Sequence, residues 1–171
     1  EIGEGAAIAP FVVIGARVRI GARARILSHV SIAEDATIGA DALIHPGVRI
    51  GARVRIGDRF ISQPGAVIGG DGFSYVTPQP GVVEEARAEG VISSRERQAY
   101  VRVNSLGAVR IGDDVEVGSN ACIDRGTISD TTVGDGSKID NLVMVGHNVQ
   151  VGSGCLLCGH TGIAGSAIIG D

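Results

Sequence analysis

An aliphatic residue returns at every sixth position along most of this chain. The series covers Ile2–Ile68, resumes at Ile111 and, after one slip, covers Val133–Ile169. Of its 22 positions, 21 hold Ile, Val or Leu and one holds Ser62, and glycine follows at 13 of the 22. A helix needs spacings of three or four and an amphipathic strand alternates by two, so neither element alone carries a period of six.

A period of six is typical of a parallel β-helix, in which each hexad supplies a short strand and a tight corner. Three hexads form one triangular coil, so each aliphatic side chain stacks on its equivalent three hexads later. This ladder explains how only five aromatic residues suffice in a chain of 171. The sequence therefore predicts an all-β fold, a left-handed parallel β-helix of about seven coils, in a single domain over residues 1–171.

Composition excludes several classes of protein. The apolar runs are short and are interrupted by Arg or Asp, so none could span a bilayer, and no secretory signal opens the chain. A net charge of −4 argues against nucleic-acid binding through bulk charge. The three cysteines, Cys122, Cys155 and Cys158, are too few for a disulfide framework and are expected to be reduced.

Charge is unevenly distributed along the chain. Residues 1–60 hold eight arginines against six acidic residues, a balance of +2. Two interpretations stay open for this flank: a docking surface for an acidic partner, or arginines scattered over a solvated face.

Two interruptions of the repeat are candidates for function, because insertions in a solenoid project from one face. The longer, at about residues 70–107, is predicted to be an inserted loop; it holds Phe73, Tyr75 and Tyr100 and a charged stretch over 83–97. This loop is either ordered against a neighbour or ligand, or a disordered excursion. In the shorter, Ile123 and Val133 are ten residues apart instead of six, which predicts a bulge.

His147 is the best candidate for a catalytic group. It lies two residues after the inward position Val145, so its ring should project outward. Asp140 lies seven residues earlier, and we expect it to orient the imidazole of a general base. Gly165 lies three hexads later, where its N–H could stabilise an oxyanion one strand spacing from the base. His160 either lines the same cleft or is a bystander.

A set of ordered motifs resembles one family over essentially the whole chain. The motifs are Asp71-Gly72-Phe73, Ser105-Leu106-Gly107, Val115-Glu116-Val117-Gly118, Ile123-Asp124-Arg125-Gly126, Ile139-Asp140-Asn141, Gly146-His147-Asn148 and Ala164-Gly165-Ser166. Together they resemble the bacterial UDP-3-O-acylglucosamine N-acyltransferases of lipid A biosynthesis, within the hexapeptide-repeat acyltransferases.

The resemblance implies a cytoplasmic bacterial homotrimer with active sites between neighbouring subunits. It implies a 3-hydroxyacyl thioester on acyl carrier protein as donor, a UDP-acylglucosamine as acceptor, and no cofactor or metal. His147 would be the base, Asp140 its carboxylate partner and Gly165 the oxyanion donor. Residues expected to contact substrate are Asn141, His160, Phe73 and Asn148.

The chain departs from the family in two respects. His160 stands where many relatives have Gln. The family's N-terminal uridine-binding domain and C-terminal helices are expected to be absent, since the chain begins and ends in phase with the repeat.

Three alternative functions compete with this interpretation. An O-acyltransferase of the same pathway would use a His base on the same scaffold. A metalloenzyme of the γ-carbonic-anhydrase type would need three converging histidines, whereas His147 and His160 are more than two hexads apart and on different faces. An ice-binding solenoid would need ranks of Thr on one flat face.

Overall fold

The computed structural model describes residues 1–78, 87, 88, 90 and 99–171 and divides into two compact units. The first unit consists of Glu1–Gly72 and Ser105–Asp171, and the second is Phe73–Asn104. Most of the charged stretch over 83–97 lies outside the described residues.

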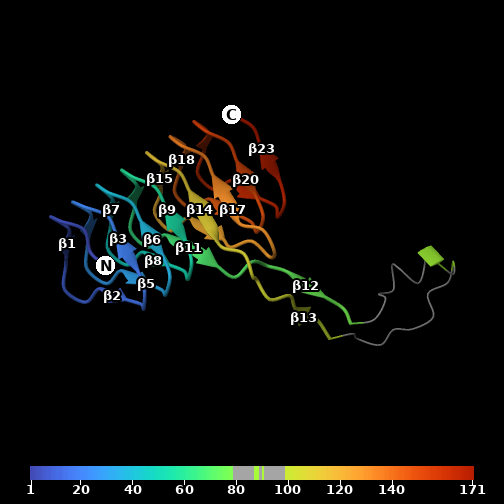
Figure 1. The fold of residues 1–171 in the computed structure, drawn as a ribbon. Helices are drawn as coiled ribbons and strands as arrows, with labels where there is room; N and C mark the ends of the chain where they lie inside the picture. The colour runs from blue at the N-terminus through green and yellow to red at the C-terminus, as the bar shows by residue number, and fades with distance from the viewer. Residues whose placement is uncertain (79–86, 89, 91–98) are drawn as a thin grey trace. The chain divides into compact units, whose positions relative to one another are not determined.

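Three parallel sheets of seven strands form the first unit, and successive strands enter successive sheets (Figure 1). The first sheet contains β1 (Ala7–Ile8), β4 (Arg25–Ile26), β7 (Leu43–Ile44), β10 (Ile61–Ser62), β15 (Glu116–Val117), β18 (Lys138–Ile139) and β21 (Leu156–Leu157). The second contains β2 (Val13–Ile14), β5 (Ser31–Ile32), β8 (Arg49–Ile50), β11 (Val67–Gly70), β16 (Cys122–Asp124), β19 (Met144–Val145) and β22 (Gly162–Ile163). The third contains β3 (Arg19–Ile20), β6 (Thr37–Ile38), β9 (Arg55–Ile56), β14 (Val109–Ile111), β17 (Thr131–Val133), β20 (Gln150–Val151) and β23 (Ile168–Ile169).

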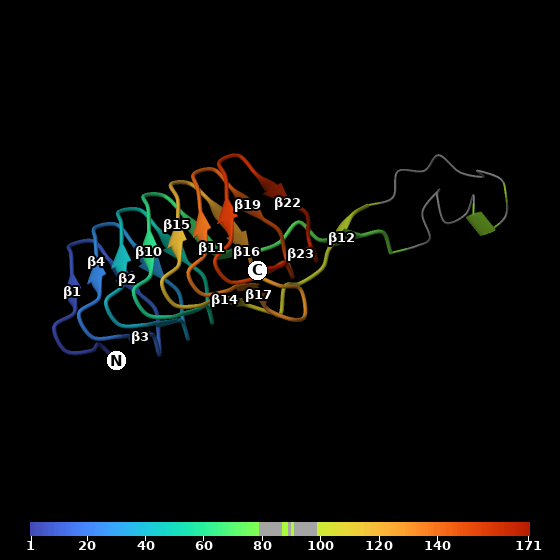
Figure 2. The ribbon, with the colours of Figure 1, turned by 90° about the horizontal axis from the view of Figure 1, so that it is seen from above.

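The register of these sheets is the one that the hexad period requires. Ile8 lies beside Ile26, and Ile26 lies beside Ile44, so equivalent positions stack at intervals of three hexads. Seven strands in each sheet make seven coils, and a bridge from Ile2 to Ile20 extends the third sheet by one position. Figure 2 shows these coils following one another along the unit. The prediction of an all-β, parallel β-helix of hexapeptide repeats is confirmed.

The aliphatic positions of the repeat form the core. Ile26, Ile44, Ile68 and Val117 are completely buried, as expected if their burial drives coiling. The residue two positions earlier also faces the interior: Ala24, Val30, Val48 and Ala66, among others, are fully buried.

Ser62, the exception in the series, lies in the core. Its hydroxyl is buried and has no hydrogen-bond partner among the described residues. Two residues earlier, Phe60 is also completely buried. A small side chain at the strand position thus accompanies a large one two residues earlier, and both face the close-packed interior.

Ion pairs join the corners of successive coils. Arg23 (φ 56°), Asp41 (φ 57°), Arg59 (φ 55°) and Asp114 (φ 56°) all occupy the left-handed conformation in one corner column. Arg23 Nη2 lies 2.6 Å from Asp41 Oδ2, and Arg59 Nε lies 2.7 Å from Asp114 Oδ1. The hydrogen bond from each arginine lowers the pKa of the carboxyl group that it contacts.

An equivalent pair at another corner joins Arg17 to Asp35 at 2.7 Å. Three of the eight arginines in residues 1–60, Arg17, Arg23 and Arg59, are therefore paired with carboxylates of the chain itself.

The second unit contains an antiparallel pair, β12 (Tyr75–Val76) and β13 (Val101–Arg102). The Arg102 guanidinium lies 4.6 Å from the centre of the Tyr75 ring, which stabilises the pair through a cation–π contact. Phe73 meets Tyr75 edge to face, with ring centres 5.1 Å apart.

All three cysteines are free thiols, as the sequence predicts. Within the part of the chain that the structure describes, no helix has the length and apolar character needed to cross a membrane.

Candidate active site

The ten-residue spacing between Ile123 and Val133 produces a loop that links β16 to β17. Arg125 fastens the start of this loop to two earlier coils. Its backbone N–H donates to Gly70 O at 2.8 Å, its Nε to Gly69 O at 3.1 Å, and its Nη2 to Ala52 O at 2.6 Å.

Asp130 fastens the end of the same loop. Its Oδ1 accepts a hydrogen bond from the Ala108 N–H at 2.8 Å, and its Oδ2 lies 2.5 Å from Arg110 Nε. The hydrogen bond from Arg110 lowers the pKa of Asp130, so the carboxylate stays charged to lower pH than a free Asp. The loop is therefore held at both ends.

His147 follows β19 and is half-buried beside this loop. Its Nδ1 lies 3.0 Å from Asn148 Oδ1 and 3.4 Å from Thr127 Oγ1. The ring is thus contacted on its Nδ1 side by two polar side chains, one of them from the loop.

Two glycines leave the space that the imidazole occupies. A Cβ added to Gly165 would lie 2.6 Å from His147 Nε2, and one added to Gly72 would lie 2.7 Å from His147 Cβ. Either methyl group would overlap the histidine. Gly165 lies one coil above His147, where the spacing of three hexads predicts it, and the Ser166 N–H donates to His147 O at 2.8 Å.

The corner position that Gly165 occupies presents an N–H suited to a negatively charged oxygen. At equivalent positions the N–H groups of Ala40 and Ser153 donate to carboxylate oxygens of Asp58 and Asp171, each at 2.7 Å. Charge-assisted bonds of this length are the strong ones. The fold therefore repeatedly uses this N–H to bind an anionic oxygen.

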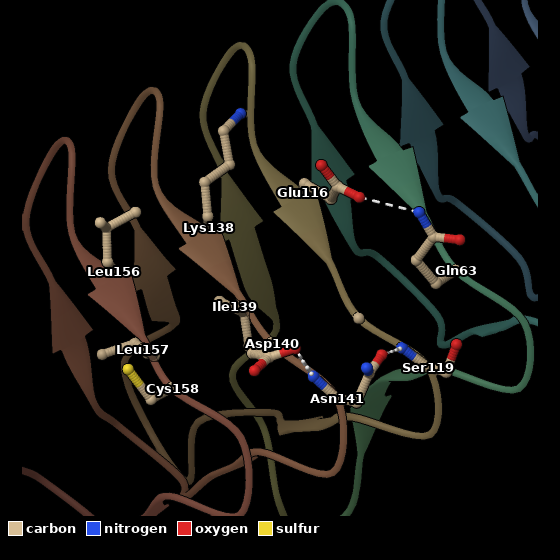
Figure 3. Close-up of a pocket in the computed structure, with 11 residues that line it drawn as sticks. Gln63, Glu116, Ser119, Lys138, Ile139, Asp140, Asn141, Leu156, Leu157 and Cys158 are labelled. Carbon is tan, nitrogen blue, oxygen red and sulfur yellow. Dashed lines mark hydrogen bonds between the residues drawn. The ribbon is translucent and has the colours of Figure 1, made fainter.

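Asp140 and Asn141 lie at a different corner, after β18, where they line a hollow of about 520 Å³ (Figure 3). Asp140 Oδ1 accepts from the Asn141 N–H at 2.7 Å, and Asp140 Oδ2 accepts from the Gly159 N–H at 3.0 Å. The other residues of the hollow are Gln63, Glu116, Gly118, Ser119, Lys138, Ile139, Leu156, Leu157 and Cys158. It combines charged, amide and aliphatic groups, as a site for a polar ligand with an apolar part would.

The structure does not bring Asp140 and His147 together within one chain. Asp140 follows a strand of the first sheet and His147 follows a strand of the second, so the two side chains leave different corners of the triangle. The carboxylate binds backbone N–H groups at its own corner, and the described residues that bond to the His147 ring are Asn148 and Thr127.

Three residues predicted to contact substrate, His160, Phe73 and Asn148, do not line the hollow beside Asp140. His160 is exposed at a corner with φ 62°, where its N–H donates to Asn141 O at 3.2 Å. Phe73, which is 83% exposed, belongs to the second unit. The amide of Asn148, expected to contact substrate, is bonded within the chain.

Among the described residues, no group of three or more His, Cys, Asp or Glu side chains is placed to hold a metal ion. The histidine cluster that a γ-carbonic-anhydrase-type site requires is therefore not formed within this part of the chain.

Comparison with known proteins agrees with this architecture. The family model described as bacterial transferase hexapeptide (six repeats) matches residues 130–165, and that of the hexapeptide repeat of succinyl-transferase matches residues 29–58 and 108–147. A UDP-3-O-acylglucosamine N-acyltransferase from Ruegeria pomeroyi is 60% identical over 106 residues, covering 61% of this chain and 29% of the relative. The chain belongs to the hexapeptide-repeat acyltransferases.

Another N-acyltransferase of the same name, from Bordetella pertussis, is 42% identical over 127 residues, covering 74% of this chain and 31% of the relative. The matches thus span less than a third of the length of these relatives.

Solved structures show the same fold. The UDP-N-acetylglucosamine O-acyltransferase from Moraxella catarrhalis superposes with a TM-score of 0.74 at 22% identity, over 99% of this chain and 58% of that one. The corresponding acyltransferase from Arabidopsis gives a TM-score of 0.67 at 16% identity, over 98% of this chain and 56% of that one.

The contacts of Thr127, Ser129 and Gly72 around His147 and Asn148 could not be predicted from the sequence. Thr127 and Ser129 lie in the predicted bulge, whose irregular spacing was the only signal that they were unusual. Gly72 opens the longer interruption, and its contact with His147 depends on how the chain leaves β11.

Proposed function

We propose that this chain is the catalytic β-helix of a bacterial, cytoplasmic UDP-3-O-acylglucosamine N-acyltransferase. The enzyme would transfer a 3-hydroxyacyl group from the thioester of acyl carrier protein to the 2-amino group of the sugar nucleotide. The similarity to the Ruegeria pomeroyi enzyme supports the assignment. The observation that carries it is the placement of His147 Nε2 against Gly165, a glycine whose side-chain space the imidazole fills.

In this mechanism His147 acts as a general base through Nε2. It removes a proton from the 2-amine as the nitrogen attacks the thioester carbonyl. The carbonyl oxygen gains negative charge, and the Gly165 N–H donates to it, as equivalent N–H groups donate to carboxylates at other corners. Collapse of the tetrahedral intermediate breaks the C–S bond, and the proton held by the imidazole passes to the leaving thiolate.

The acceptor half of the site would come from a neighbouring copy in a homotrimer. Asp140 and Asn141 line a hollow at one corner and His147 stands at another, which supports a division of the site into two halves on different corners of each chain. Side-by-side packing of identical prisms would bring the first corner of one copy against the second corner of the next. The Asp140 carboxylate would then bind polar groups of the sugar. His160 and Phe73 remain proposed substrate contacts.

Competition between two acceptors tests the assignment. The full-length protein is supplied with 3-hydroxyacyl carrier protein, UDP-3-O-acylglucosamine and UDP-N-acetylglucosamine, and products are identified by mass spectrometry. An amide formed on the first acceptor is expected. An ester formed on the second would show the O-acyltransferase alternative to be correct, and the absence of both products from a folded trimer would refute acyl transfer to either sugar.

A further inference from the structure

We propose that Asn148 is a positioning residue that places the ring proton of neutral His147 on Nδ1 and so leaves Nε2 as the free base. The use of that base in acyl transfer rests on the proposed function, whereas the position of the proton follows from contacts within the chain. The ten-residue spacing between Ile123 and Val133, which precedes this site, has a function in this arrangement.

The orientation of the Asn148 side-chain amide is fixed by two backbone groups. Its Nδ2 lies 2.9 Å from Ser129 O, and its Oδ1 lies 3.0 Å from the Thr127 N. A carbonyl oxygen can only accept and a backbone N–H can only donate. The amide nitrogen must therefore face Ser129 and the amide oxygen must face Thr127, since a flipped amide would lose both bonds.

The fixed amide determines the protonation of the neighbouring ring. Asn148 Oδ1 also lies 3.0 Å from His147 Nδ1, and an amide oxygen is an acceptor only. A hydrogen bond across this distance requires the proton on Nδ1. The other nitrogen of the neutral ring then carries a lone pair, and it is Nε2 that faces Gly165.

The backbone of Asn148 is held as firmly as its side chain. Its N–H donates to Thr131 Oγ1 at 2.9 Å, and Thr131 is completely buried at the start of β17. The amide also contacts Ser129 Oγ at 3.0 Å. Asn148 adopts φ 60°, a conformation that Asn tolerates better than most residues.

The extra residues of the loop supply the groups that orient the amide. Thr127 and Ser129 both lie within it, and Arg125 and Asp130 fasten its two ends. A corner of ordinary length would leave the Asn148 amide without these partners. The loop therefore orients Asn148, and through Asn148 it positions the ring of His147.

The test determines which ring nitrogen of His147 carries the proton in the full-length protein. Histidine is labelled with ¹⁵N, and long-range ¹H–¹⁵N spectra recorded on the neutral ring show which nitrogen of His147 carries the proton. The variants are Asn148→Gly, which keeps the positive φ and removes the amide, and Asn148→Asp, which keeps an acceptor toward Nδ1. Asn120→Gly is the matched control, because Asn120 has φ 54° at another corner.

We expect the wild-type protein, Asn120→Gly and Asn148→Asp to carry the proton on Nδ1. In Asn148→Gly we expect a mixture of the two tautomers and a rate of acyl transfer lower by about 10-fold. A wild-type ring protonated on Nε2, an unchanged ring in Asn148→Gly, or loss of the Nδ1 proton in Asn148→Asp would overturn the inference. If the tautomers change as expected but the wild-type protein forms no amide product, the proposed function fails and the positioning role stands.

Discussion

The imidazole of His147 is enclosed by residues from several coils. Gly72 follows β11, Thr127 lies in the loop after β16, and Gly165 lies in the coil above. Each contributes either empty space or one hydrogen bond. The site is thus defined as much by absent side chains as by present ones, and glycine is the only residue that fits at two of these positions.

Replacement of Gly165 tests that requirement. The methyl group of Gly165→Ala would lie 2.6 Å from Nε2 and would displace the ring, so we expect acyl transfer to fall by about 10²-fold. Gly162→Ala is the matched control, since a Cβ there meets nothing within 4 Å. Steady-state rates and thermal unfolding of both variants decide the outcome: equal rates for the two variants would show that the Gly165 position is not critical.

At the scale of single residues, the sequence predicts which residues stack in successive coils, but not the corner from which each side chain points. The contact of Gly165 with His147 follows from a spacing of three hexads, because the coil length is constant there. Asp140 and His147 do not meet within one chain, because a corner separates the sheets from which they leave. The amide contacts of Asn148 depend on the path of an irregular loop, which no periodicity describes.

The strands and corners are the elements of this fold, and the corners carry its charges. Along one column Arg23, Asp41, Arg59 and Asp114 alternate in sign from coil to coil. The period of six predicts where each strand and corner lies, and it predicts that equivalent corner residues stack. It could not predict the ion pairs, because the pairing also requires side chains that leave the left-handed corners in a common direction.

Lowering the pH should remove the stabilisation that the ion pairs of this corner column contribute. The pKa of Asp41 is lowered in the folded protein by the hydrogen bond from Arg23, so the folded state binds this proton less readily than the unfolded state. The stabilisation is present above the unfolded pKa of an aspartate, about 4, and is lost as the pH falls through the lower, folded value.

Urea unfolding as a function of pH measures this effect. We expect Asp41→Asn to lower the free energy of unfolding at pH 7 and to leave it closer to wild type at pH 3, although exposure of the pair keeps the difference small. Glu4→Gln, which removes an exposed carboxylate with no ion pair among the described residues, is the control. A difference between Asp41→Asn and wild type that does not shrink in acid would contradict the account.

On the scale of the whole molecule, the first unit is a ladder of seven coils in which the hollow lined by Asp140 and the side chain of His147 lie at different corners. The sequence predicted this β-helix because each hexad corresponds to one strand and one corner, and three hexads make one coil. It could not predict the antiparallel pair of the second unit or any contact with a second copy, because such contacts depend on segments and surfaces that follow no repeat.

Mixed oligomers test whether neighbouring copies share a site. His147→Ala and Asp140→Ala should each be inactive alone, because each removes one half-site from every interface. Co-expression should restore activity to about a quarter of wild type, since about one interface in four pairs an intact His147 with an intact Asp140. Purified mixed oligomers with no more activity than the separate variants would show that one chain supplies both groups.

The most direct test of the account is the rate of amide formation by His147→Ala in the full-length protein. The rate is compared with that of His29→Ala, which removes an exposed corner histidine far along the chain from the site. We predict that His147→Ala lowers the rate by about 10²- to 10⁴-fold while thermal unfolding and oligomeric state match wild type, and that His29→Ala does not. A folded His147→Ala protein that forms the amide at the wild-type rate would contradict the role of His147 as the base.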